Sequence, residues 1–176
     1  MKKTLLALAG LAALLCACGV VPLPAVAIPD QSLSLPSSAG FENYVAYDGS
    51  DAFGGTSLPG LLSNVSVSGN VDYAGAGTLK QVAVYLRSSM PSCAAPPLSK
   101  SPLSKSQLCA AGDEAGQRIG TISIQNGAVT GFQLAGGALD AAAKAGHGYF
   151  GVQAIQGASL VGDTLKLSGM KASAKF

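Results

Sequence analysis

Residues 64–88 read NVSVSGNVDYAGAGTLKQVAVYLRS, and this stretch decides the fold. In residues 64–73, apolar side chains alternate with polar ones, which is the period-two pattern of a half-buried β-strand. The same alternation returns in residues 78–88. Because only the glycine-rich turn 74–77 separates the two runs, the stretch predicts an antiparallel hairpin.

The alternation continues on both sides of this hairpin. Residues 118–125 and 128–134 flank the pair Asn126-Gly127, a strong tight-turn signal, and predict a second hairpin. Further strands are predicted over residues 41–48, 149–155 and 163–176. In the last of these the apolar face changes near Gly169, which predicts a β-bulge.

One segment breaks the strand pattern. Residues 136–146 contain good helix formers bounded by glycines and predict a short helix. We therefore predict an all-β fold over residues 41–176: a single antiparallel β-sandwich of about seven strands, with one short helix before the penultimate strand.

This helix is similar to the crossover before strand F in immunoglobulin-like and fibronectin-like domains. The resemblance implies that Tyr149 bonds back to the preceding loop. The chain has no Trp, and Cys93 and Cys109 flank one loop, so the likeness is architectural and does not set a function.

The beginning of the chain predicts export. Lys2 and Lys3 form a basic n-region, and residues 5–15 form an apolar run too short for a permanent membrane span. We expect residues 1–17 to be a signal peptide.

The run ends in Leu15-Cys16-Ala17-Cys18, which resembles the bacterial lipobox cut by the lipoprotein signal peptidase. Cys18 is the matching cysteine, because a small residue precedes it. The resemblance implies a diacylglycerol thioether on Cys18, cleavage before that residue and acylation of the new amino group. Several acyl chains together give a lasting membrane anchor.

The lipobox divides the rest of the chain into a lipidated N-terminus with a flexible tether over residues 18–40 and the folded domain. Residues 19–40 are rich in Pro and Ser and have no period, which is typical of an extended tether. The alternative is ordinary secretion with cleavage after Ala25-Val26-Ala27, which satisfies the small-x-small rule.

The mature chain is expected to be electrically neutral. Of the eleven Lys and Arg residues two lie in the signal, which leaves nine against nine Asp and Glu. Without a basic patch, binding to nucleic acid has no electrostatic basis. The expected partners are the membrane, through the N-terminal lipid, and an envelope protein.

Cys93 and Cys109 remain once Cys16 is removed and Cys18 is lipidated. In an oxidising compartment we expect them to form a disulfide, with a metal pair or a reactive thiol as the alternatives. The loop between them contains PLSKS at residues 97–101 and again at 102–106. This tandem repeat indicates either a solvated insertion or a protruding recognition loop with two lysines.

Enzymatic chemistry has few candidate groups in this chain. His147 is the only histidine, no G-x-S-x-G motif occurs, and a histidine between two turn glycines is expected to be solvated. Met90 near Cys93 would still leave a metal site short of ligands. We expect no catalytic residue, no metal and no cofactor.

The acidic clusters have structural explanations. Asp113-Glu114 is expected to be a solvated loop pair. The oxygen-rich turn around Asp48, Ser50 and Asp51 lacks the rest of a calcium loop and is better explained as an Asx turn.

These observations predict a lipid-anchored, extracytoplasmic protein of the cell envelope, at the outer membrane or cell surface, with a non-enzymatic structural or interaction role. The alternative is an extracytoplasmic binding module for a small ligand or carbohydrate. In that case Tyr44, Tyr47 or Tyr85 would serve as stacking platforms.

Overall fold

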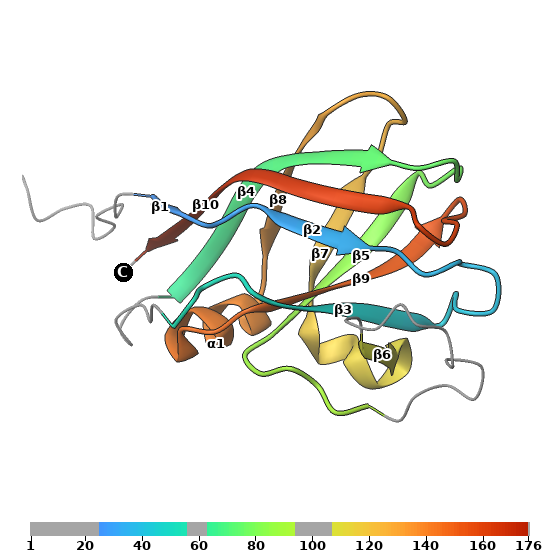
Figure 1. Ribbon diagram of the computed structural model, residues 1–176. Coiled ribbons are helices and arrows are strands. Elements are labelled where there is room, and N and C mark those ends of the chain that lie inside the picture. Colours follow the sequence, from blue (N-terminus) through green and yellow to red (C-terminus); the bar gives the residue numbers. More distant parts are fainter. Residues whose placement is uncertain (1–24, 56–62, 94–106, 176) are drawn as a thin grey trace, which may run out of the picture.

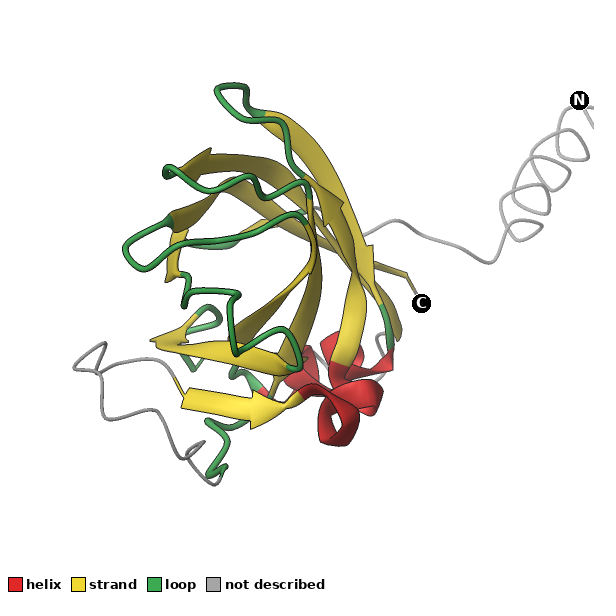
Figure 2. Ribbon diagram, turned by 90° about the vertical axis from the view of Figure 1, so that its right-hand side faces the viewer, coloured by secondary structure: helices red, strands yellow, loops and turns green. Residues whose placement is uncertain are grey.

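The computed structural model describes residues 25–55, 63–93 and 107–175. They form two antiparallel five-stranded sheets packed face to face, with one short α-helix before the penultimate strand (Figures 1 and 2). The predicted all-β sandwich is therefore confirmed. Three short strands, β1, β2 and β6, add to the seven that the alternation predicts.

The first sheet has β10 and β4 at its centre. β4 pairs on its other side with β8, and β1 and β2 both pair with β10. Its strands are β1 (Val26–Ala27), β2 (Gln31–Ser34), β4 (Ser63–Ala74), β8 (Thr130–Ala135) and β10 (Thr164–Lys175).

The second sheet has the order β6-β3-β9-β5-β7. Its strands are β3 (Tyr44–Asp51), β5 (Gln81–Arg87), β6 (Gln107–Ala110), β7 (Arg118–Ser123) and β9 (Tyr149–Gln156). A 3₁₀ helix, η1 (Ala111–Gln117), connects β6 to β7, and the α-helix α1 (Gly137–Ala145) connects β8 to β9.

The two predicted hairpins are wrong, because the strands in each predicted pair belong to different sheets. β4 pairs with β10 and β8, whereas β5 pairs with β9 and β7. Leu79 and Ile124, which lie in the two connections, are buried in the core. Because the core lies between the two sheets, a connection that buries such a side chain there passes from one sheet to the other. The tight turn at Asn126-Gly127 does form, with the Ala128 N–H donating to the Gln125 carbonyl over 3.1 Å.

The N-terminal part of the domain also differs from the expectation. The sequence predicts an extended tether over residues 18–40, but β1 and β2 are part of the first sheet. Ile28, Leu33 and Leu35 are buried in the core. Burial of these apolar side chains offsets the entropy of ordering the segment. The folded domain therefore begins well before residue 41.

The main core lies between the sheets. Inward-facing side chains alternate along the strands, as in Val82, Val84 and Leu86 of β5, and α1 closes one end with Leu139. The predicted bulge is confirmed, because the pairing of β10 with β4 shifts register after Ser168, beside Gly169 with its φ of +58°.

Asp163 connects the turn after β4 with the loop before β10. Its side chain is 3% exposed and accepts a short hydrogen bond from the Tyr73 hydroxyl. The backbone N–H groups of Leu160 and Ala76 donate to the same carboxylate over 2.7 and 3.1 Å. Burial alone would raise the pKa of Asp163, but these hydrogen bonds lower it below its ordinary value. A Cβ added at Gly75 would lie 2.2 Å from this carboxylate, which explains the glycine there.

Candidate functional site

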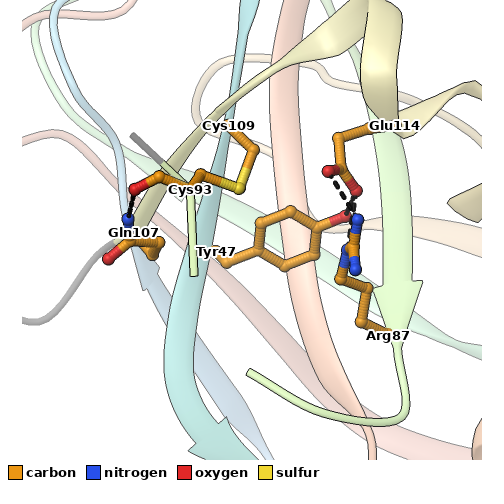
Figure 3. Close-up of a disulfide and its surroundings, with 6 residues drawn as sticks. All are labelled: Tyr47, Arg87, Cys93, Gln107, Cys109 and Glu114. Atoms are coloured by element: carbon orange, nitrogen blue, oxygen red, sulfur yellow. Dashed lines mark hydrogen bonds and ion pairs between the residues drawn. A yellow bond between two sulfur atoms is a disulfide. The ribbon is translucent and has the colours of Figure 1, made fainter. Parts of the chain in front are cut away.

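The outer face of the second sheet carries a second, smaller apolar cluster. Val45, Tyr47, Ala83, Tyr85 and Cys109 are all buried there. They form a cluster separate from the main core, and η1, which follows the edge strand β6, contacts β3, β5 and β6 beside it. Figure 3 shows Tyr47 and Cys109 of this cluster together with Glu114 of η1. This face is therefore covered in part by the chain that follows the loop between the two cysteines.

The predicted disulfide joins the chain after β5 to the edge strand β6. Cys93 and Cys109 are bonded, with their Cα atoms 5.3 Å apart (Figure 3). The Gln107 side-chain amide adds a hydrogen bond to the Cys93 carbonyl over 2.6 Å. The two ends of the loop are therefore held together by a covalent bond and a hydrogen bond.

An ion pair holds η1 next to the disulfide. The Glu114 side chain is 1% exposed and accepts two hydrogen bonds from the Arg87 guanidinium, each 2.8 Å long. The Tyr47 hydroxyl donates a third over 2.6 Å. This geometry is bidentate and nearly saturates the carboxylate, as a buried charge requires.

The three groups shift one another's pKa values. Burial raises the pKa of Tyr47, and its hydrogen bond to the Glu114 carboxylate raises it further. Burial also acts to raise the pKa of Glu114, but the hydrogen bonds from Arg87 and Tyr47 outweigh it, so the Glu114 pKa lies below its ordinary value. Glu114 is therefore ionised at neutral pH, while Tyr47 stays protonated.

The arrangement indicates a structural clamp rather than reactive chemistry. The sulfur atoms of Cys93 and Cys109 and a carboxylate oxygen of Glu114 lie within 4.8 Å of one another, which is a spacing that a metal ion accepts. However, the sulfurs are bonded to each other and the carboxylate is occupied by Arg87 and Tyr47. In the disulfide form these atoms have no capacity left for a metal.

Reducing this disulfide should lower the free energy of unfolding by about 3 kcal/mol, because the unfolded chain regains the entropy of a loop of this size. Urea denaturation with and without a thiol reductant would measure the loss. The double variant Cys93→Ala/Cys109→Ala should start at the lower stability and be insensitive to the reductant. Equal stability of the oxidised and reduced protein would contradict this expectation.

Gly151 in β9 allows Tyr47 to lie flat against the sheet. A Cβ at Gly151 would lie 2.6 Å from the Tyr47 ring and 2.8 Å from the Val45 side chain. We expect Gly151→Ala to lower the free energy of unfolding by about 2 kcal/mol through overpacking. Gly131→Ala in β8 is the matched control, since its nearest neighbour would be 4.0 Å away. Similar denaturation midpoints for the two variants would argue against the close contact.

The carbohydrate platform expected from the tyrosines is not formed by two of its three candidates. Tyr47 is completely buried and Tyr85 is 4% exposed, with its hydroxyl donating to Gln153. Tyr44 is half-buried and packs edge-on against Phe41, with ring centroids 6.0 Å apart. The sequence correctly places these aromatics on strands, but it does not show that η1, Met90 and Cys93 pack against the outer face of the second sheet.

Other sequence candidates fall into two groups. The expectation that Asp113-Glu114 is solvated is wrong for Glu114, which lies in the clamp, whereas Asp113 is exposed. The Asx turn is confirmed, because the Ser50 N–H donates to the Asp48 carboxylate over 3.1 Å. Met90 packs against the smaller apolar cluster.

His147 is half-exposed and its Nδ1 lies 2.7 Å from a carboxylate oxygen of Asp51. The other Asp51 oxygen accepts from the backbone N–H groups of Gly148 and Phe53. Among the hydrogen bonds of the described residues, none connects this histidine to a serine or Tyr149 to the preceding loop. The Ser-His-Asp arrangement and the tyrosine corner are therefore not assembled in that part of the chain.

An apolar pocket of about 340 Å³ lies at the α1 end of the sandwich. It is bounded by β1, the chain after β3, α1 and the last part of β10. Its lining includes Val26, Ile28, Phe53, Ala143 and Ala172, and every lining residue within the described part of the chain is apolar or glycine. The pocket has the size of a small-ligand site, but among the described residues its polar groups come from the backbone alone and no polar side chain orients a ligand.

Three of the sequence predictions lie outside the described residues. These are the signal peptide over residues 1–17, the lipidation of Cys18 and the character of the repeat-containing loop, of which residues 94–106 are not described. No helix within residues 25–55, 63–93 and 107–175 is long and apolar enough to cross a membrane.

Comparisons with known proteins add no relative. No family model matches the chain, and no curated protein or solved structure matches it either.

Proposed function

We propose that this chain is a lipid-anchored protein of the cell envelope with a non-enzymatic structural or interaction role. The basic n-region, the apolar run and the lipobox ending in Cys18 support export and lipidation. The disulfide between Cys93 and Cys109 is typical of an oxidising, extracytoplasmic compartment.

The observation that carries the proposal is that Val26 and Ala27 belong to the folded domain. They form β1 and pair with Ala172 and Lys171 of β10. Secretion with cleavage after Ala27 would remove this strand. It would also leave a charged ammonium on Ile28, which is 6% exposed and whose N–H donates to the Met170 carbonyl over 3.0 Å. Cleavage before Cys18 keeps the whole domain intact.

The disulfide between Cys93 and Cys109 on the second sheet supports an interaction role. It fixes both ends of a loop that contains Lys100 and Lys105, and long loops fixed on a rigid scaffold often carry binding functions. The proposed partners are the membrane, through the lipid on Cys18, and an envelope protein contacted by this loop.

The intact mass of the protein taken from its native envelope tests the anchor. We expect a chain that starts at Cys18 and carries acyl groups, and that gains the mass of two hydrogen atoms on reduction. Cys18→Ser should abolish the acyl mass, whereas Cys16→Ser should not. An unmodified chain that starts at Ile28 would contradict the proposal and indicate secretion.

Amine-reactive cross-linking on intact cells tests the interaction role. Replacing Lys100 and Lys105 with arginine keeps both charges but removes the reactive amines, so a partner cross-linked through the loop should be lost. Lys166 and Lys171 lie exposed on β10, and replacing these two with arginine is the matched control. If the first double variant retains every cross-linked partner, the loop is not the contact.

A further inference from the structure

The chemistry of the apolar pocket selects an aliphatic ligand. Small-molecule sites normally combine apolar walls with a few polar groups that fix the orientation of the ligand. Here the walls offer side chains such as Ile28, Phe53 and Ala172, and no polar side chain of the described residues lines the pocket. A sugar or a peptide would lose its hydrogen bonds to water with only a few backbone groups to replace them, whereas a hydrocarbon chain loses none.

The wall formed by residues 52–54 is held in place by hydrogen bonds. The Asp51 carboxylate accepts from the Phe53 and Gly148 N–H groups, and the Ala52 N–H donates to the Gly148 carbonyl over 2.7 Å. The Phe53 ring also packs against Gly148, where a Cβ would lie 2.7 Å from it. The pocket is thus preformed and does not need its ligand to shape it.

The pocket lies close in the sequence to Cys18, whose proposed acyl chains are hydrocarbon ligands. Val26 lines the pocket and lies only eight residues after Cys18. A fully extended chain of this length spans at most about 28 Å, so an acyl group on Cys18 is confined to the neighbourhood of the pocket. Such a short connection gives an effective concentration in about the millimolar range.

We infer that this pocket binds one of the acyl chains carried by Cys18. The inference rests on the proposed lipidation. Each methylene that enters the pocket from water strengthens binding by about fourfold. The chain bound in this way is withdrawn from the bilayer, and the α1 end of the sandwich is thereby held next to the membrane surface.

The test uses a fatty acid that carries a photoactivatable diazirine. Cells that express the full chain are fed this fatty acid and irradiated, and the purified protein is digested and analysed by mass spectrometry. We expect the acyl chain on Cys18 to be cross-linked within the same molecule to peptides that contain Ile28, Phe53 or Ala143.

Ala27→Phe is the blocking variant, because Ala27 lines the pocket yet is exposed, so the larger side chain does not enter the core. It should lower the yield of these cross-links, because the phenyl ring takes up space that the acyl chain would occupy, and should weaken binding from water by at least about tenfold, the effect of excluding two methylenes. Ala135→Phe, at an exposed position of β8, is the matched control and should leave the yield unchanged.

A second experiment tests whether the pocket binds an acyl chain when the protein itself carries no lipid. The unlipidated chain starting at residue 18 with Cys18→Ser is irradiated with the free diazirine fatty acid in the absence of detergent, and the same peptides should be labelled. Labelling of this form alone, with the acyl chains of the lipidated protein linked only to membrane lipids, overturns the inference. So does an absence of labelling in both forms, which would indicate that the chain itself fills the pocket. If the native protein carries no acyl mass, the proposed lipidation itself has failed.

Discussion

Replacing Asp163 with alanine should lower the free energy of unfolding by about 3 kcal/mol, because several buried donors lose their acceptor at once. The Tyr73 hydroxyl and the N–H groups of Leu160 and Ala76 all donate to this carboxylate. Urea denaturation followed by circular dichroism would measure the change. Asp72→Ala is the control, since Asp72 is a neighbouring, partly exposed carboxylate for which no such bonds are found, and it should change stability by less than about 0.5 kcal/mol.

The same carboxylate should make the protein sensitive to acid. Its folded-state pKa is lowered, so its contribution to stability is fully present above the unfolded pKa of about 3.9 and is lost as the pH falls through the folded value. Burial and the Asp163 hydrogen bond raise the pKa of Tyr73 to about 12, so the hydroxyl remains a donor throughout this range. Asp163→Asn should flatten the loss of stability below pH 4. An unchanged acid profile in this variant would count against the assignment.

Replacing Glu114 with alanine should cost about 3 kcal/mol, because it leaves the Arg87 charge and the Tyr47 hydroxyl without their acceptor. This value is at the low end for a buried pair, since the Arg87 side chain is 30% exposed and regains some water. The adjacent Asp113→Ala is the matched control and should be nearly neutral, because Asp113 is exposed. Equal effects of the two substitutions would contradict the clamp.

A double variant separates the cost of an uncompensated buried charge from the cost of lost packing. Glu114→Leu with Arg87→Met removes both charges together and should recover most of the stability lost in Glu114→Ala, because well-packed apolar residues often replace a buried ion pair without cost. Tyr47→Phe on this background should then recover further stability, because it removes a buried hydroxyl that has lost its acceptor. If the double variant is as unstable as Glu114→Ala, the lost stability comes from packing and not from the uncompensated charge.

The strands of this fold are predictable from the sequence, but their partners are not. Period-two alternation identifies strands such as residues 64–73, and glycine pairs identify the turns between them. A turn signal shows where the chain reverses direction but does not show which sheet the next strand joins. In hindsight, Leu79 and Ile124 are the informative residues, because a buried apolar side chain inside a connection indicates a crossing between sheets.

The missing short strands have a similar explanation. Leu33 and Leu35 alternate with Ser32 and Ser34, which is a strand signal, but the prolines on both sides favour a tether. Tertiary pairing with the edge of β10 decides the matter. An alternating pattern with only two apolar residues is too short to predict a strand against the flanking prolines, because the partner strand lies far along the chain.

The candidate site was predictable only in its covalent part. Compartment and cysteine count predict the disulfide, whereas the clamp depends on Glu114 from η1 meeting Arg87 from β5. One signal was present in the sequence. By the period of two, Arg87 lies on the same face of its strand as Ala83 and Tyr85, and a charged side chain on a face with apolar neighbours needs a partner of opposite charge if that face is buried. The sequence does not show which carboxylate provides it.

The closed base of the Cys93–Cys109 loop makes this part of the chain an insertion site for protein engineering. Because the disulfide and the Gln107 hydrogen bond fix both ends, a change in the enclosed length does not reach the sheets. Doubling the length of such a loop costs only about 0.6 kcal/mol in closure entropy. The repeated PLSKS looks like one such length change already made, and a foreign epitope of similar size should be displayed there at equally low cost.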